Sequence, residues 1–80
     1  MKAKAIIKEI NQNRIKAQIY KISRKNHNEL YVINCSEKTK FFNCDINTLK
    51  PQDNIEIIFN GAVALSLPPQ IYANKIRLLI

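Results

Sequence analysis

Residues 2–22 read KAKAIIKEINQNRIKAQIYKI, two alternating segments on either side of the turn signal Asn11-Gln12-Asn13. Folding them as a hairpin about residue 12 puts Lys8 opposite Lys16, position 6 opposite 18 and position 4 opposite 20. The even positions then form a basic surface, and Lys21 breaks the parity, which predicts a bulge or bend near Tyr20–Ile22. The odd positions form an apolar face that we expect inside a sheet, made of Ala3, Ala5, Ile7, Ile15, Ala17 and Ile19.

Strand patterns continue through the rest of the chain. Further extended segments are expected at 30–35, 39–42, 55–59 and 71–80. Between the third and fourth main strands, Asn43 or Asp45 is placed to cap one helical turn, and Pro51 predicts a β-turn after it. Five main strands with this short helical turn follow the order of an OB-type barrel. We predict an all-β fold, a small five- to six-stranded OB-like barrel in a single domain of residues 1–80, with an SH3-like barrel as the alternative.

The formal net charge of +7 lies entirely in the first third of the chain. Residues 1–25 hold eight basic side chains against one acid, Glu9, whereas residues 26–80 hold five bases and five acids. A domain that is charged so unevenly has a positive side, and positive surfaces attract polyanions. The charge therefore indicates an anionic partner, most readily single-stranded nucleic acid.

The even face of the hairpin is the candidate site for that partner. Lys8 opposite Lys16 would be a like-charge pair costing up to about 1 kcal/mol, which a bound polyanion would relieve. Strands two and three are also where OB barrels commonly bind oligonucleotides, and Tyr20 is an aromatic side chain on which a base could stack. The candidate residues are Lys4, Lys8, Arg14, Lys16, Tyr20 and Arg24. The alternative is a solvated lysine-rich face that serves solubility.

The Pro-containing segment 61–73 supports a second interpretation. Two prolines brace the crossing to the last strand, because they offer no backbone donors to a sheet. The same segment predicts an exposed apolar ridge for a protein partner or for self-association, with Leu65, Leu67, Pro68 and Tyr72 as its candidate residues. A protein-interaction or homo-oligomerising barrel is therefore the alternative function.

A family resemblance lies in the C-terminal part of the chain. Residues 61–73 read GAVALSLPPQIYA and match the pattern G-x-[VI]-x-x-[ST]-x-P-x-Q-[IV]-x-A. With the preceding residues 49–57, this segment resembles the YobA-like family of small bacterial domains of unknown function. The resemblance implies an OB-like barrel and no known functional residues. Many members of that family look exported.

Several classes of function are not supported by the residues. One glycine gives no phosphate-binding loop, the acids are scattered, and the single His27 lies in a polar turn, so we expect no enzyme. Cys35 and Cys44 show no metal-ligand spacing, and we expect reduced thiols with no metal or cofactor. No apolar run approaches the roughly 20 residues of a membrane span. The N-terminus lacks the features of a signal peptide, so a cytoplasmic location is expected.

Overall fold

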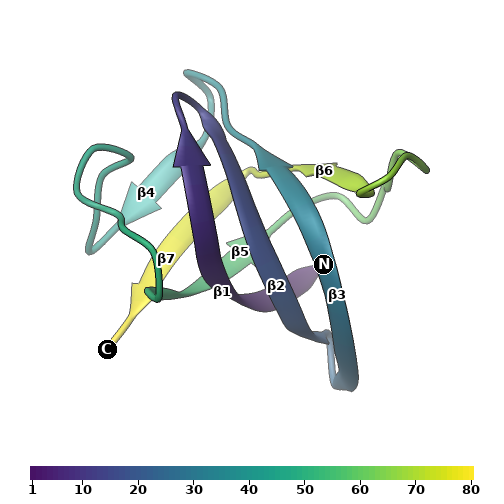
Figure 1. The fold of residues 1–80 in the computed structure, drawn as a ribbon. Coiled ribbons are helices and arrows are strands. Elements are labelled where there is room, and N and C mark those ends of the chain that lie inside the picture. The colour runs from purple at the N-terminus through teal and green to yellow at the C-terminus, as the bar shows by residue number, and fades with distance from the viewer.

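The computed structural model describes all 80 residues as β-strands joined by turns and loops, with no helix (Figure 1). The strands are β1 (Lys2–Asn11), β2 (Arg14–Ile22), β3 (Lys25–Asn34), β4 (Lys40–Phe42), β5 (Asn54–Ile58), β6 (Gln70–Tyr72) and β7 (Lys75–Leu79). β3 begins at Lys25, earlier than the pattern predicted, so β1, β2 and β3 form a meander of three long strands. None of the elements is a helix long and apolar enough to cross a membrane.

The chain itself joins the two ends of the sheet. The strand order is β4-β7-β5-β1-β2-β3-β6, and only Ala73 and Asn74 separate β6 from β7. The Ala73 amide donates to the carbonyl oxygen of Asn34 on β3 at 3.0 Å, whereas the Asn74 amide donates to that of Ile58 on β5 at 2.7 Å. The β6–β7 segment therefore bridges β3 and β5 and curls the sheet round on itself (Figure 1). This confirms the OB-like barrel, with the expected last strand divided in two.

The barrel interior holds the residues that the alternation assigned to it. All six odd-position side chains of the first hairpin are at most 1% exposed. They join a cluster of 16 buried residues, to which β5 contributes Ile55 and Ile57 and the end of that strand contributes Phe59. Branched isoleucines suit this position because they pack well on a pleated surface.

Two bulges change the register of the β1–β2 hairpin. Ile6 faces Gln18 as predicted, but the predicted Lys8–Lys16 pair is wrong. An extra residue in β1 at Lys8 shifts the pairing, so that Glu9 faces Lys16 and an opposite-charge pair replaces the like-charge one. A second irregularity at Tyr20 confirms the predicted bend and places Lys4 opposite Lys21, not opposite position 20.

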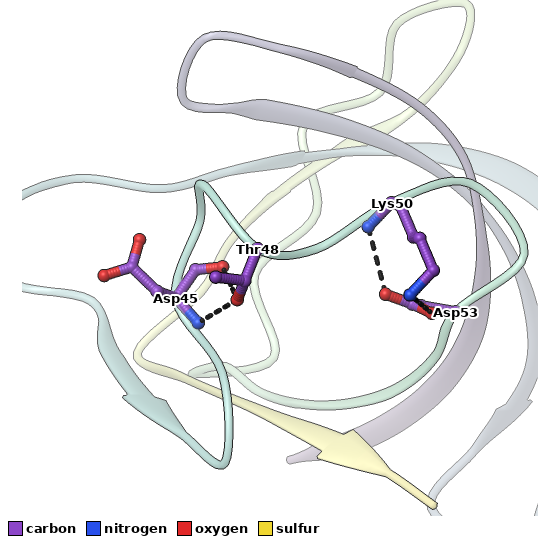
Figure 2. Close-up of polar contacts among 4 residues, drawn as sticks. All are labelled: Asp45, Thr48, Lys50 and Asp53. Atoms are coloured by element: carbon purple, nitrogen blue, oxygen red, sulfur yellow. Dashed lines mark hydrogen bonds and ion pairs between the residues drawn. The ribbon is translucent and has the colours of Figure 1, made fainter.

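The segment between β4 and β5 has one hydrogen-bonded turn where a short helical turn was predicted (Figure 2). The Asp45 carbonyl accepts hydrogen bonds from the amides of Thr48 and Leu49, and the Asp45 amide donates to Thr48 Oγ1 at 3.0 Å. The helical hydrogen-bond pattern does not continue further, and the turn places Leu49 in the core. The predicted β-turn at Pro51 follows, where the Lys50 amide donates to Asp53 Oδ2 at 3.0 Å.

Candidate nucleic-acid interface

The 59–69 loop between β5 and β6 ends at the edge of β3. The Val32 amide donates to the Pro69 carbonyl oxygen at 2.9 Å. Val32 is only 3% exposed, yet it does not belong to the core cluster. Its neighbours Tyr31 and Ile33 do belong to it, so Val32 faces outward and is covered from outside the barrel.

A groove of about 310 Å³ remains between this loop and the tip of the β1–β2 hairpin. We call it the loop groove, and its lining residues are Glu9, Asn11, Arg14, Lys16, Val32, Leu67, Pro68 and Gln70. It brings together residues from the basic hairpin face and from the proline segment, which the sequence assigned to two separate sites.

Two rows of paired residues cross the outer sheet surface at the loop groove. The first row is Glu9, Lys16, Val32 and Gln70, and the second is Asn11, Arg14, Asn34 and Tyr72. Each row runs over β1, β2, β3 and β6. Neighbouring strands lie about 4.8 Å apart, so the backbones of Arg14 and Tyr72 are about 10 Å apart with Asn34 between them. An arginine and an aromatic ring therefore lie on one surface, within the span of a single nucleotide or two.

The side chains around the loop groove are open to solvent and to ligands. Arg14 and Lys16 are exposed and take part in no ion pair. The Tyr72 ring is 68% exposed, and Leu67 is 99% exposed. Between them, Asn34 Nδ2 donates to Gln70 Oε1 at 3.0 Å and to the Ile71 carbonyl at 3.3 Å. The surface combines free cations, an exposed ring and amides that can hydrogen-bond.

The other predicted polyanion contacts lie elsewhere. Lys8 is exposed in the β1 bulge near the hairpin tip, and Lys4 is half-buried towards the other end of β1. Arg24 lies in the turn after β2, so that the length of β2 separates it from Arg14. Tyr20 is half-buried, and its hydroxyl donates to Asn54 Oδ1 on β5 at 2.7 Å. The structure thus places only Lys8, of these four, near Arg14 and Lys16.

The predicted apolar ridge is divided between two surroundings. Leu65 is 94% exposed at the outer part of the loop, whereas Pro68 is half-buried and lines the loop groove. Tyr72 lies on β6, in the row of Arg14. Sequence reasoning placed Tyr72 with the ridge and missed Asn34 and Gln70, because their position depends on the parallel pairing of β3 with β6.

The two cysteines lie outside both the basic hairpin face and the loop groove. Cys35 and Cys44 are free, and no group of three or more His, Cys, Asp or Glu side chains is placed to hold a metal ion. Burial raises the pKa of the Cys35 thiol to about 11, and burial is also the largest cause of the raised pKa of Cys44. Because the thiolate is the reactive form, a raised pKa lowers the reactivity of a thiol at neutral pH.

We expect Cys35 to resist alkylation by iodoacetamide at pH 8 in the folded protein and to react rapidly in urea. Its pKa in the folded protein lies above the ordinary thiol value, so the unfolded chain loses this proton first. The free energy of unfolding should therefore fall as the pH rises from the ordinary thiol pKa towards 11. Peptide mass spectrometry of alkylated protein measures the first effect, and rapid modification of native Cys35 at pH 8 would contradict the burial.

The barrel and the loop groove define the chain as an OB-type domain with a basic and aromatic outer surface. Among solved structures, the crystal structure of Ag(I)CusF is similar to it, with a TM-score of 0.71 and 15% sequence identity over 99% of this chain and 96% of that chain. At this identity the likeness shows the fold alone. No protein-family model and no curated protein matches the chain, so the resemblance to the YobA-like family is not confirmed.

Proposed function

We propose that the protein is a non-catalytic binding module that takes single-stranded nucleic acid in the loop groove. The observation that carries the proposal is the row in which Arg14 and Tyr72 flank Asn34, with Lys16 in the next row. Phosphates would meet the unpaired cations on β2, and a base would stack on the exposed Tyr72 ring. OB barrels commonly use this face and the loop between the fourth and fifth strands of the fold, here the 59–69 loop, for oligonucleotides.

The half-buried amides of Asn34 and Gln70 suit a single strand better than a duplex. An unpaired base offers its edge and its flat surface at once, and Asn34 and Gln70 lie between the cation and the ring. Glu9 opposite Lys16 reduces the positive charge of the groove, so binding by charge alone should be weak there. The ring and the amides would then contribute affinity that a polyanion without bases, such as heparin, cannot use.

The test is fluorescence anisotropy with labelled single-stranded RNA and DNA over a range of salt concentrations, with heparin as competitor. In the Arg14→Gln/Lys16→Gln variant we expect about tenfold weaker binding. The slope of log K against log[salt] should become shallower by about 1.4, because each phosphate contact on a single strand contributes about 0.7. The matched control is Arg24→Gln/Lys25→Gln, which removes the same charge at the far end of β2.

Equal losses in the two double variants would mean that only net charge matters, and the loop groove would not be the site. Unchanged affinity in Arg14→Gln/Lys16→Gln would also contradict the proposal. Heparin that competes as well as an unlabelled oligonucleotide would remove the role given to bases.

A second candidate function is self-association through the 59–69 loop. Leu65 and Leu67 are 94% and 99% exposed. Two neighbouring leucines that are open to water on one loop of a small domain are a feature of surfaces that bind another protein. This function requires a dimer or larger species in light scattering that Leu65→Ser/Leu67→Ser converts to a monomer. A wild-type protein that is monomeric at every concentration would rule it out.

A further inference from the structure

A second hollow lies on the outer face of β1, β5, β7 and β4. Its volume is about 450 Å³, within the range of about 300–1,000 Å³ that small-molecule sites occupy. We call it the basic hollow, and the lining residues used below are Lys2, Phe42, Glu56, Lys75 and Arg77. None of these was singled out from the sequence as a binding residue.

The basic hollow is surrounded by most of the protein's excess charge. In one row of paired residues Lys21, Lys4, Glu56, Arg77 and Phe42 cross β2, β1, β5, β7 and β4. In the next row Lys2, Ile58, Lys75 and Lys40 cross β1, β5, β7 and β4. Six bases thus share one face with a single acid. The basic side chains of β1 and β2 lie beside those of β4 and β7. The net charge of the later part of the chain is zero, but its basic side chains on this face are not fully offset by acids.

Glu56, the single acid of this face, pairs with two of the six basic side chains, and its one negative charge does not offset both. Glu56 is 6% exposed, and its Oε1 accepts a hydrogen bond from Arg77 Nη2 at 2.8 Å. Its Oε2 lies 3.8 Å from Lys2 Nζ. Each oxygen therefore has a cationic partner, and the guanidinium keeps further N–H donors for other acceptors. The buried carboxylate therefore holds the Arg77 guanidinium at the hollow, and the Lys2 ammonium lies close to it.

The remaining four lysines on this face form no ion pair. Lys75 and Lys40 are directly paired neighbours on β7 and β4, and Lys4 and Lys21 are paired neighbours on β1 and β2. Like charges that are paired across neighbouring strands repel each other. Of the four lysines Lys75 lines the basic hollow, so an anion bound there relieves its repulsion with Lys40.

An exposed aromatic ring completes the rim. Phe42 is 45% exposed at the end of β4, and Lys75 Nζ lies 5.7 Å from the centre of its ring. This cation–π contact keeps the ring and an unpaired ammonium side by side. A ligand that joins a planar ring to a phosphate would meet both groups, with Arg77 and Lys2 behind them.

We propose that the basic hollow binds a free nucleoside phosphate, with its phosphates between Lys2, Lys75 and Arg77 and its base against Phe42. The volume and the closeness of one ring to a small set of cations fit a mononucleotide. The site shares no lining residue with the loop groove, so it does not depend on the proposed function.

The experiment is an NMR titration of the ¹⁵N-labelled protein with adenosine 5′-diphosphate, and in parallel with pyrophosphate, adenosine and a 5′-phosphorylated oligothymidylate. We expect saturable amide shifts from the diphosphate at Phe42, Ile58, Lys75 and Arg77. Lys2→Gln/Lys75→Gln should weaken this binding about tenfold or more. Phe42→Leu should weaken it about tenfold and abolish the preference for adenosine diphosphate over pyrophosphate. Arg77 is left in place, since its removal would leave Glu56 buried without its closest partner.

Arg14→Gln/Lys16→Gln is the charge-matched control and should leave the affinity for adenosine diphosphate unchanged. The proposal fails if the diphosphate gives no saturable shifts at these residues in the folded protein. Pyrophosphate that binds as tightly as the nucleotide would overturn the role of Phe42. Shifts here from the oligothymidylate alone would assign the surface to a strand end and overturn the free nucleotide.

Discussion

Replacement of Phe59 by alanine is expected to lower the free energy of unfolding by about 3–5 kcal/mol. Phe59 is 1% exposed and is the largest fully buried side chain. Its backbone is also tied to the N-terminus, because the Phe59 amide donates to the Met1 carbonyl and the Met1 ammonium donates to the Phe59 carbonyl. Domains of this size lie near the lower end of the usual range of about 5–15 kcal/mol, so the variant should keep only about 0–2 kcal/mol and be marginally folded.

Urea denaturation followed by circular dichroism measures this effect. Phe42→Ala is the matched control, because it makes the same change at a ring that is 45% exposed, and it should cost about 1 kcal/mol or less. Phe59→Leu provides a folded variant of intermediate stability if Phe59→Ala cannot be purified. Equal stability of Phe59→Ala and Phe42→Ala would contradict the core described above.

Replacement of Tyr72 by alanine is expected to weaken binding of single-stranded nucleic acid by about 1–3 kcal/mol, or about 5- to 150-fold. The ring is 68% exposed and its hydroxyl forms no hydrogen bond within the protein. Its removal should therefore take away stacking and leave the fold intact. The salt dependence should not change, because no phosphate contact is lost.

Tyr72→Phe separates stacking from general damage, since it keeps the flat ring and should retain most of the affinity. Anisotropy titrations at two salt concentrations measure both quantities. A loss in Tyr72→Phe as large as that in Tyr72→Ala would show that the ring does not act by stacking. A changed salt slope in Tyr72→Ala would point to an indirect effect on Arg14.

Local alternation was enough to predict the barrel interior but not the register. The six odd-position side chains predicted for the interior are buried, because side chains alternate between the two faces of a strand whatever its partner. The bulge at Lys8 was missed even though Ile10, on an even position, packs against the core. Ile6 is also an even-position isoleucine, yet it lies half-buried on the outer face. An isoleucine at an even position therefore does not by itself show that the strand has changed the face it turns inward.

The residues of the two basic surfaces could be predicted from the sequence only in part. Arg14 and Lys16 were found from their own strand, where charge and alternation coincide. Tyr72, Lys75 and Arg77 were not assigned to basic surfaces, because their neighbours on β3, β5 and β4 are distant in sequence. A charge count along the chain assigns them to a neutral half. Only the closed order of the strands places them beside the bases of other segments.

The measurement that tests the proposed function most directly is an NMR titration of the ¹⁵N-labelled wild-type protein with a single-stranded oligonucleotide at moderate salt. We expect saturable amide shifts concentrated at Arg14, Lys16, Asn34, Leu67 and Tyr72, the residues around the loop groove. Shifts confined to the Ser23–Lys25 turn, spread evenly over all lysines, or absent altogether would contradict binding in the loop groove.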